Sequence, residues 1–305
     1  MMVTRVLAAT GQKVRNALKL VLRTTAGRIG LPIVLLYLVL ALIGPDYFGH
    51  FGLWNWLPHS PTGMPEPLVE YQFLRPSSQF WLGTDQYGRD ILSRVLCGAT
   101  SLITTAAAGA ALGIVLGTVV GISSGYKGGK VDEVVMRVMD GLMSFPTLLL
   151  ALLVLFTLGS SRVNIAATIG FVSMPSIARV VRSTTLSLKE QEFVQSARLR
   201  GESTPYIILR EILPNVLPIL GVEASVRLSY AILTVASLGF LGLGIQPPSP
   251  DWGLAISQGR RFLVSAPWVV LAPMAAVASL VVGINLLVDG IRQASRMTQG
   301  EEHHE

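Results

Sequence analysis

The chain is poor in charged residues and in cysteine, and each shortage excludes a class of protein. Only 14% of its 305 residues are Asp, Glu, Lys or Arg, whereas a soluble domain carries about 25%. A single cysteine, Cys97, permits neither an internal disulfide nor a cysteine-based metal cluster. The mean hydropathy is +0.56, and several apolar runs approach the ~20 residues that a spanning helix needs. The sequence therefore predicts an all-α integral membrane protein.

Catalytic and metal-binding patterns are also lacking. The four histidines fall in predicted loops or in the C-terminal tail, at His50, His59, His303 and His304. They show neither metal-ligand spacing nor a Ser/His/Asp arrangement. We therefore expect no metal site, no cofactor bound by this chain and no enzymatic activity. The net charge of +6 does not indicate nucleic acid, because the basic residues gather beside apolar runs, as orientation signals in a lipid bilayer do.

Six apolar runs predict six transmembrane helices, at residues 29–47, 96–123, 134–158, 165–181, 216–244 and 269–287. Of the 24 Lys and Arg residues, 17 fall in segments that this topology places inside and 6 in segments that it places outside. Because positive charge accumulates on the cytoplasmic side, both termini are expected in the cytoplasm. All five tryptophans fall in or beside predicted outer loops, where an interfacial belt would place them.

The predicted organisation is a helical core with extensions. Residues 1–28 hold six basic residues and no acidic one, which predicts a basic cytoplasmic tail. The first transmembrane helix and an external loop rich in Pro, Trp and Gly occupy residues 29–95. A five-helix core follows over residues 96–291, and a second cytoplasmic tail over residues 292–305.

The second predicted span carries glycine at a helical spacing. Glycine recurs at every fourth position, at Gly109, Gly113, Gly117, Gly121 and Gly125. Residues four apart share one face of a helix, and a face of glycines lets another helix approach backbone to backbone. We expect this stripe to be a helix-packing surface.

Prolines and ionisable residues interrupt two other spans. In the third, Pro146 is expected to kink the helix. Arg137 and Asp140, three residues apart near the inner interface, are expected to form a structural ion pair, with a proton relay as the alternative. In the fifth, Glu223 and Arg227 stand four apart and can pair on one face. Two interpretations of that pair stay open. It borders a solute path or stabilises one conformation of it, or it is a structural pair within the helix bundle.

A polar segment over residues 188–214, between the fourth and fifth spans, is the most distinctive part of the chain. It predicts two short helices joined at Gly201, with Pro205 in the first turn of the second and Pro214 ending it or opening the next span. It holds four acidic and four basic residues, whereas a loop built to hold anionic lipid would be basic. Each helix also has one apolar stripe, so the segment predicts a docking element for a protein outside the membrane.

The same segment resembles the cytoplasmic loop of binding-protein-dependent ABC importer permeases. That family's pattern is Glu-Ala-Ala, three residues, Gly, nine residues, then Ile-x-Leu-Pro. The chain matches it at Ala197, Gly201, Leu213 and Pro214, and departs from it at Gln195, Ser196 and Glu211. The resemblance implies coupling helices seated in a groove of an ATPase, with the apolar stripe as anchor. The residues to which it assigns coupling are Glu192, Gln195, Ser196, Ala197, Gly201, Glu211, Leu213 and Pro214.

Four longer stretches, at residues 80–99, 125–152, 236–253 and 284–294, look like the dipeptide, oligopeptide and nickel permeases, specifically their C-type subunit. This resemblance implies the fold of a type I ABC importer permease. It also implies a heterodimer with a homologous permease subunit, two ATP-binding subunits and an external substrate-binding protein. The expected location is the plasma membrane of a bacterium or archaeon.

The resemblance further implies that the chain forms the path for a solute, with a di- or oligopeptide as the first expectation and nickel or another small solute as the alternative. ATP and Mg would be bound by the partner subunits, since this sequence has no GxxxxGK[ST] phosphate loop. An ion-coupled secondary transporter is the alternative from another class. It would be expected to carry more ionisable residues at the membrane midplane than this chain has.

Overall fold

The computed structural model describes residues 20–43, 69–246 and 250–302, with the side chains of residues 42–43 and 295–302 excepted. These parts are helical, apart from loops and one isolated β-bridge between Thr84 and Asp90. The α-helices are α2 Thr25–Ile43, α3 Ile91–Lys127, α4 Gly129–Met143, α5 Thr147–Leu158, α6 Arg162–Leu188, α7 Glu192–Leu199, α8 Thr204–Tyr206, α9 Leu213–Phe240, α10 Trp252–Gly259 and α11 Trp268–Glu302.

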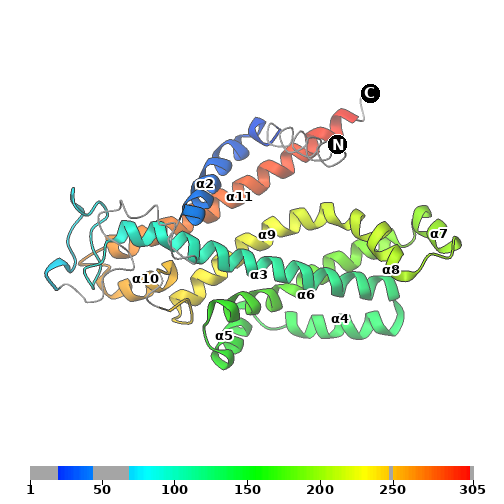
Figure 1. Cartoon of the computed structure of the whole chain (residues 1–305), viewed down its shortest axis with the longest axis horizontal. Coiled ribbons are helices and arrows are strands. Elements are labelled where there is room, and N and C mark those ends of the chain that lie inside the picture. Colours follow the sequence, from blue (N-terminus) through cyan, green and yellow to red (C-terminus); the bar gives the residue numbers. More distant parts are fainter. Residues whose placement is uncertain (1–19, 44–68, 247–249, 303–305) are drawn as a thin grey trace, which may run out of the picture.

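The long helices α3, α6 and α9 run along the long axis of the molecule (Figure 1). The short helix α10 lies at one end of that axis and α7 at the other, while α2 and α11 form a side-by-side pair (Figure 1). Four helical stretches are long and apolar enough to cross a membrane: Ile91–Lys127, Arg162–Leu188, Thr204–Phe240 and Trp268–Ala294. The pair α4 and α5 makes a fifth if counted as one broken span. The apolar part of α2, Thr25–Ala41, is shorter, so the six-helix count stays a prediction.

The third span differs from the kinked helix expected from the sequence. Helices α4 and α5 meet at an angle of 89°, and Pro146 stands before α5 rather than inside a helix. Proline disfavours helical backbone at the residue before it and cannot donate a backbone hydrogen bond, so the helix breaks there completely. Helix α5 alone, with 12 residues, is about 18 Å long and too short to cross a bilayer.

The glycine stripe of α3 lies against α6. A Cβ added at Gly109 would lie 2.8 Å from Cβ of Ile169, and one added at Gly117 would lie 2.6 Å from Cβ of Ile177. The other glycines of the stripe meet α6 in the same way, at Gly113, Gly121 and Gly125. Because a side chain at these positions would occupy the space of α6, the two helices pack backbone to backbone along most of their length.

The pair formed by α2 and α11 uses the same device. Gly30 of α2 faces the backbone of Gly283 and Leu287 in α11, and a Cβ there would collide with it. Across the pair, the Tyr37 hydroxyl and Ser279 Oγ share a hydrogen bond of 2.7 Å. Close approach of glycine backbones thus holds two separate helix pairs together.

The helix of the fifth span begins earlier than the sequence predicts. It runs without interruption from Thr204 to Phe240, through a π-helical stretch at Ile207–Ile212. Pro214 was expected to end one helix or open another, and it lies in the first turn of α9, directly after the π-helical stretch and without a break in the helix. The wide turn ends with the amide of Leu213 donating to the carbonyl of Ile208, directly before the proline that has no amide to donate.

Replacing Gly117 with alanine is expected to destabilise the fold. The added Cβ would lie 2.6 Å from Ile177, so α3 and α6 must separate, at a cost of about 1–3 kcal/mol. Gly141 of α4 is the matched control, because nothing lies within 4 Å of an added Cβ there. The thermal unfolding midpoint of the detergent-purified protein should fall for Gly117→Ala and not for Gly141→Ala. Equal midpoints for the two variants would contradict the close packing of α3 on α6.

Candidate coupling segment and solute path

Gly201 forms the turn between the two helices of the polar segment. Its φ angle is +77°, a conformation that favours glycine. The amide of Gly201 donates to the Arg198 carbonyl at 2.9 Å, and the amide of Glu202 donates to the Ala197 carbonyl at 3.2 Å. These two bonds make a Schellman motif, which ends α7 and turns the chain towards α8. An added Cβ would meet nothing within 4 Å, so backbone conformation alone requires glycine here.

Part of the apolar surface of the polar segment faces its own chain. Ala197 and Val194 of α7 are completely buried. They lie in one hydrophobic cluster with Ile207, Ile212 and Val216 of the helix that leads into α9, and with Ile177 and Val181 of α6. The resemblance implied that the apolar stripe anchors the segment in a partner's groove. In the structure the stripe is divided: Ala197 and Ile212 are buried in this cluster against α6 and α9, whereas Phe193 is 37% and Leu209 61% exposed.

A different set of side chains remains available to a partner. Leu199, at the end of α7, is 89% exposed, and Leu209 is 61% exposed. Glu192, Phe193 and Ser196 are also exposed on α7. Sequence reasoning missed Leu199, although its place two residues after the buried Ala197 puts it on another face of the helix.

Polar contacts fix the segment to the end of α3. The Lys189 ammonium donates to the carbonyl of Gly125 at 3.3 Å, and the Arg198 guanidinium lies 5.2 Å from the ring centre of Tyr126. Gln195, which departs from the family pattern, donates its amide to the Lys189 carbonyl at 3.3 Å. The segment is therefore held both by apolar burial and by contacts to the last turn of α3.

Glu211 also lies within reach of α7. It stands 3.9 Å from Arg200, which in turn lies 3.8 Å from Glu202. The Arg200 side chain is more than half exposed, so solvent screening leaves these pairs weak. Of the remaining residues assigned to coupling, Leu213 is half-buried and Pro214 exposed.

Helix α4 is tied to α6 by two ion pairs. Asp132 accepts from both Nε and Nη2 of Arg182 at 2.5 Å, and Asp140 accepts from Arg179 at 2.5 Å. The expected pairing of Arg137 with Asp140 is wrong, since Arg137 binds Glu133 at 2.7 Å instead. Residue spacing within one helix cannot predict that Asp140 pairs with Arg179, because Arg179 belongs to a different span, α6.

Glu223 and Arg227 form an ion pair in the middle of α9. Arg227 Nε donates to Glu223 at 3.0 Å, and both side chains are 19% exposed. Arg227 lines a hollow of about 540 Å³ between α5, α6 and α9. The structure thus places this ion pair beside a cavity. From the sequence alone, a role at the solute path and a purely structural role were equal alternatives.

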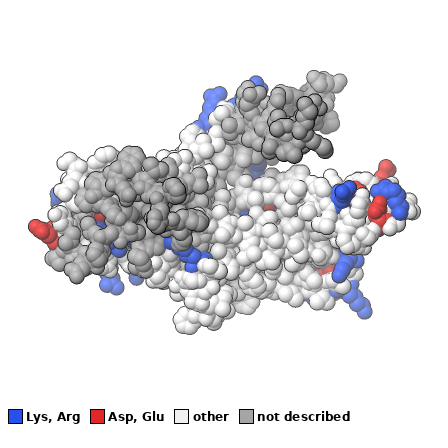
Figure 2. All heavy atoms as spheres, viewed as in Figure 1, with Lys and Arg blue, Asp and Glu red and all other residues white. Residues whose placement is uncertain are grey.

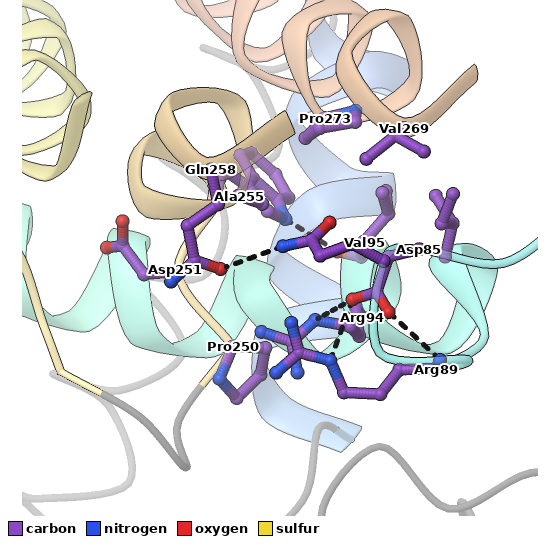
Figure 3. Close-up of a pocket in the computed structure, with 13 residues that line it drawn as sticks. Asp85, Arg89, Arg94, Val95, Pro250, Asp251, Ala255, Gln258, Val269 and Pro273 are labelled. Carbon is purple, nitrogen blue, oxygen red and sulfur yellow. Dashed lines mark hydrogen bonds and ion pairs between the residues drawn. The ribbon is translucent and has the colours of Figure 1, made fainter. Parts of the chain in front are cut away.

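The opposite end of the molecule holds a buried polar network that sequence reasoning did not single out (Figure 3). Asp85 accepts from Arg89 Nε at 2.7 Å and lies 4.0 Å from Arg94 Nε, and the Trp252 indole donates to the Val95 carbonyl at 2.9 Å. The cavity among these side chains is about 20 Å³, which suits one water molecule and excludes a solute. The network therefore joins α10 to the start of α3.

Asp251 begins α10 within this network. One carboxylate oxygen accepts from the Leu254 amide at 2.6 Å, and the side chain is almost fully buried. Burial raises the pKa of Asp251 to about 6, while the Leu254 amide and the charges of Arg94 and Arg162 act in the opposite direction.

Charged side chains gather mainly towards the two ends of the long axis on the face shown in Figure 2, with a mostly uncharged belt between them. Together with the apolar helices, this distribution defines the class: a helical protein that crosses a membrane several times, with a folded polar segment at one end.

Comparisons with known proteins identify the family. Residues 113–296 match the family described as binding-protein-dependent transport system inner membrane component. The dipeptide transport system permease protein DppC of Alkalihalophilus pseudofirmus is 35% identical over 280 residues, which cover 92% of this chain and 88% of that protein. The glutathione transport system permease protein GsiD of Pectobacterium atrosepticum is 41% identical, covering 72% of this chain and 73% of that protein. GsiD of Escherichia coli is 42% identical, covering 72% of this chain and 72% of that protein.

A solved structure shares the fold. A chain of the MetNI methionine ABC transporter, in inward facing conformations, matches with a TM-score of 0.54 and 19% identity, covering 66% of this chain and 96% of that chain. The chain described here therefore belongs to the binding-protein-dependent transport system inner membrane component family. It is a multi-pass permease subunit of an ABC importer, and not an enzyme.

The stability of the protein should depend on the ionisation of Asp251. Its pKa of about 6 lies above the ordinary value of 3.8, so the folded protein binds this proton more tightly than the unfolded chain does. The resulting stabilisation is fully present at pH values below 3.8 and is lost as the pH rises through about 6. Raising the pH from about 5 to about 8 should lower the free energy of unfolding by roughly 1.4 kcal/mol relative to an Asp251→Asn variant. Unfolding midpoints of both proteins in detergent at the two pH values measure this difference. Parallel pH dependence of the two midpoints would contradict a raised pKa.

Proposed function

We propose that this permease forms, with a homologous permease subunit, the path of an ATP-driven importer for a di- or oligopeptide delivered by an external binding protein. Family membership supports the importer. Relatives named for dipeptide and glutathione transport support a peptide as solute. The observation that carries the mechanism is the polar segment, which is packed on the membrane helices by one face and exposed by the other.

The exposed face of α7 is the surface that contacts an ATP-binding subunit. Its apolar contribution is Leu199, which is 89% exposed, while Phe193, six residues earlier, is 37% exposed and lies at the edge of that face. Charged groups of both signs surround them, from Glu192 to Arg200. An apolar anchor with a polar rim is the usual composition of a helix that lies in a groove.

Movement of α7 reaches the membrane through two rigid connections. The buried Ala197 and Val194 join α7 to α6 and α9, and the Schellman turn at Gly201 joins it to the continuous helix Thr204–Phe240. When the ATP-binding subunits close around ATP and Mg, displacement of α7 would tilt that helix and its partners between inward and outward access. In this proposal, all binding of ATP and Mg resides in the partner subunits.

In this proposal, transport needs the permease heterodimer together with two ATP-binding subunits and the binding protein. The membrane is the inner membrane of a bacterium or the plasma membrane of an archaeon. The proposal predicts that uptake requires ATP. Uptake by this chain alone in the absence of ATP would instead support an ion-coupled secondary transporter.

Replacing Gly201 with valine should separate ATP hydrolysis from transport. At a φ of +77° a β-branched side chain is strained by roughly 1–2 kcal/mol or more, so the turn between α7 and α8 should be lost. In proteoliposomes with the complete transporter, peptide taken up per ATP hydrolysed should fall at least several-fold. Gly159→Val is the matched control, because Gly159 has a φ of +80°, equally open surroundings and a position in the turn between α5 and α6. Uptake unchanged in the Gly201 variant, or lowered equally in both, would argue against a coupling role.

A further inference from the structure

The hollow between α5, α6 and α9 has the size and chemistry of a small-molecule site. Its volume of about 540 Å³ falls within the ~300–1,000 Å³ of typical ligand pockets. Polar groups reach it from all three helices: Thr147 from α5, Ser173 and Ser176 from α6, and Arg227, Thr234 and Ser237 from α9. Tyr230 and apolar side chains make up the rest of the wall.

The hollow lies deep in the membrane region. Arg227 stands fourteen residues after the first residue of α9 and thirteen before its last. At 1.5 Å per residue this places it about 20 Å from either end of the helix. A guanidinium and several hydroxyls at that depth are costly against lipid, so they indicate a water-filled cavity or a ligand.

Arg227 has hydrogen-bonding capacity left for a ligand. Its Nε donates to Glu223, and this is the one side-chain hydrogen bond that Arg227 makes within the part of the chain that the structure describes. A guanidinium carries five N–H groups in a planar fork that matches the two oxygens of a carboxylate. The hydroxyls are oriented as well: Ser173 donates to the Ile169 carbonyl at 2.7 Å and Thr234 to the Tyr230 carbonyl at 2.8 Å. Their lone pairs remain able to accept N–H groups.

The charge of the hollow favours an anionic group. Among the described residues, its wall includes Arg227 and no acidic side chain. Glu223 lies one turn away and is absent from the wall, so the positive member of the pair faces the cavity. The hollow is also open on one side, since Tyr230 is 60% exposed and Leu233 is 42% exposed. A second permease subunit on that side would complete its wall.

We propose that Arg227 binds the carboxylate of a peptide passing through this hollow, while the hydroxyls of α6 and α9 accept hydrogen bonds from its backbone N–H groups. The inference rests on the proposed function as a peptide importer. Glu223 competes with the peptide carboxylate for the Arg227 guanidinium, and the Glu223–Arg227 ion pair forms again when the peptide leaves. A transport site must bind a solute well enough to receive it and weakly enough to release it, and a competing carboxylate on the neighbouring turn supplies that balance.

The experiment compares two probes in the complete transporter, with both permeases, the ATP-binding subunits and the binding protein in proteoliposomes. The probes are trialanine and its C-terminal amide, each at a concentration that saturates the binding protein. The quantity measured is the ratio of their ATP-dependent uptake rates. Any preference of the binding protein is the same for all permease variants, so it cancels when a variant is compared with wild type.

In the Arg227→Gln variant the uptake ratio of trialanine to its amide should fall about tenfold relative to wild type, because a charge-assisted carboxylate contact is lost. Arg227→Lys, which keeps the charge without the planar fork, should give an intermediate ratio. It also tests the proposal if the glutamine variant fails to assemble. Arg137→Gln is the matched control, since Arg137 forms the same i,i+4 pair with Glu133 on an exposed face of α4, and its ratio should equal that of wild type.

Equal losses for both probes in the Arg227 variants would overturn the proposal, because a purely structural ion pair would not distinguish a carboxylate from an amide. An unchanged ratio would overturn it as well. Failure of the proposed function has a different signature: the wild-type transporter itself would take up neither probe in the presence of ATP.

Discussion

The close contact between α3 and α6 is the constraint on which the rest of the structure depends. Gly109, Gly113, Gly117 and Gly121 bring the two helix backbones together, and both helices then extend towards the end of the molecule that carries α7 (Figure 1). There the last turn of α3 receives Lys189 and Arg198, while Ile177 and Val181 of α6 receive the buried residues of α7. In lipid, where apolar side chains gain little by leaving the solvent, such backbone contact is a main source of helix association. A wider separation of these helices would remove the surface on which the polar segment packs.

That arrangement gives the polar segment, residues 188–214, two different faces. The inward face, with Val194 and Ala197, makes the segment one body with the ends of α6 and α9. The outward face, with Leu199, is free to contact another protein. Because the helix from Thr204 continues to Phe240, the same element that follows the turn at Gly201 also carries Arg227 to the hollow.

Local patterns in the sequence predicted the helices, the glycine stripe and the turn at Gly201, because each is determined by neighbours within one or two helical turns. Contacts between distant segments were not accessible in the same way. The break at Pro146 was recognised as a kink, but its 89° angle places α4 beside α6, where Arg182 binds Asp132 across 50 residues of sequence. The direction of the apolar stripe was likewise undetermined, since Ala197 and Leu199 are both apolar and only the packing of α6 decides which is buried. The network of Asp85, Arg94 and Asp251 joins segments far apart in the chain, so no local spacing marks it.

The central claim is that the exposed face of α7 meets an ATP-binding subunit and moves with ATP. Cross-linking tests it most directly, using a single cysteine introduced as Leu199→Cys in a Cys97→Ala background, with Val264→Cys, 99% exposed at the other end of the molecule, as control. With a short thiol- and amine-reactive reagent in the assembled transporter, Leu199→Cys should cross-link to an ATP-binding subunit, with a yield that changes on adding ATP and Mg. Val264→Cys should give no such product. Absence of the product from Leu199→Cys, or its formation from Val264→Cys instead, would contradict the account.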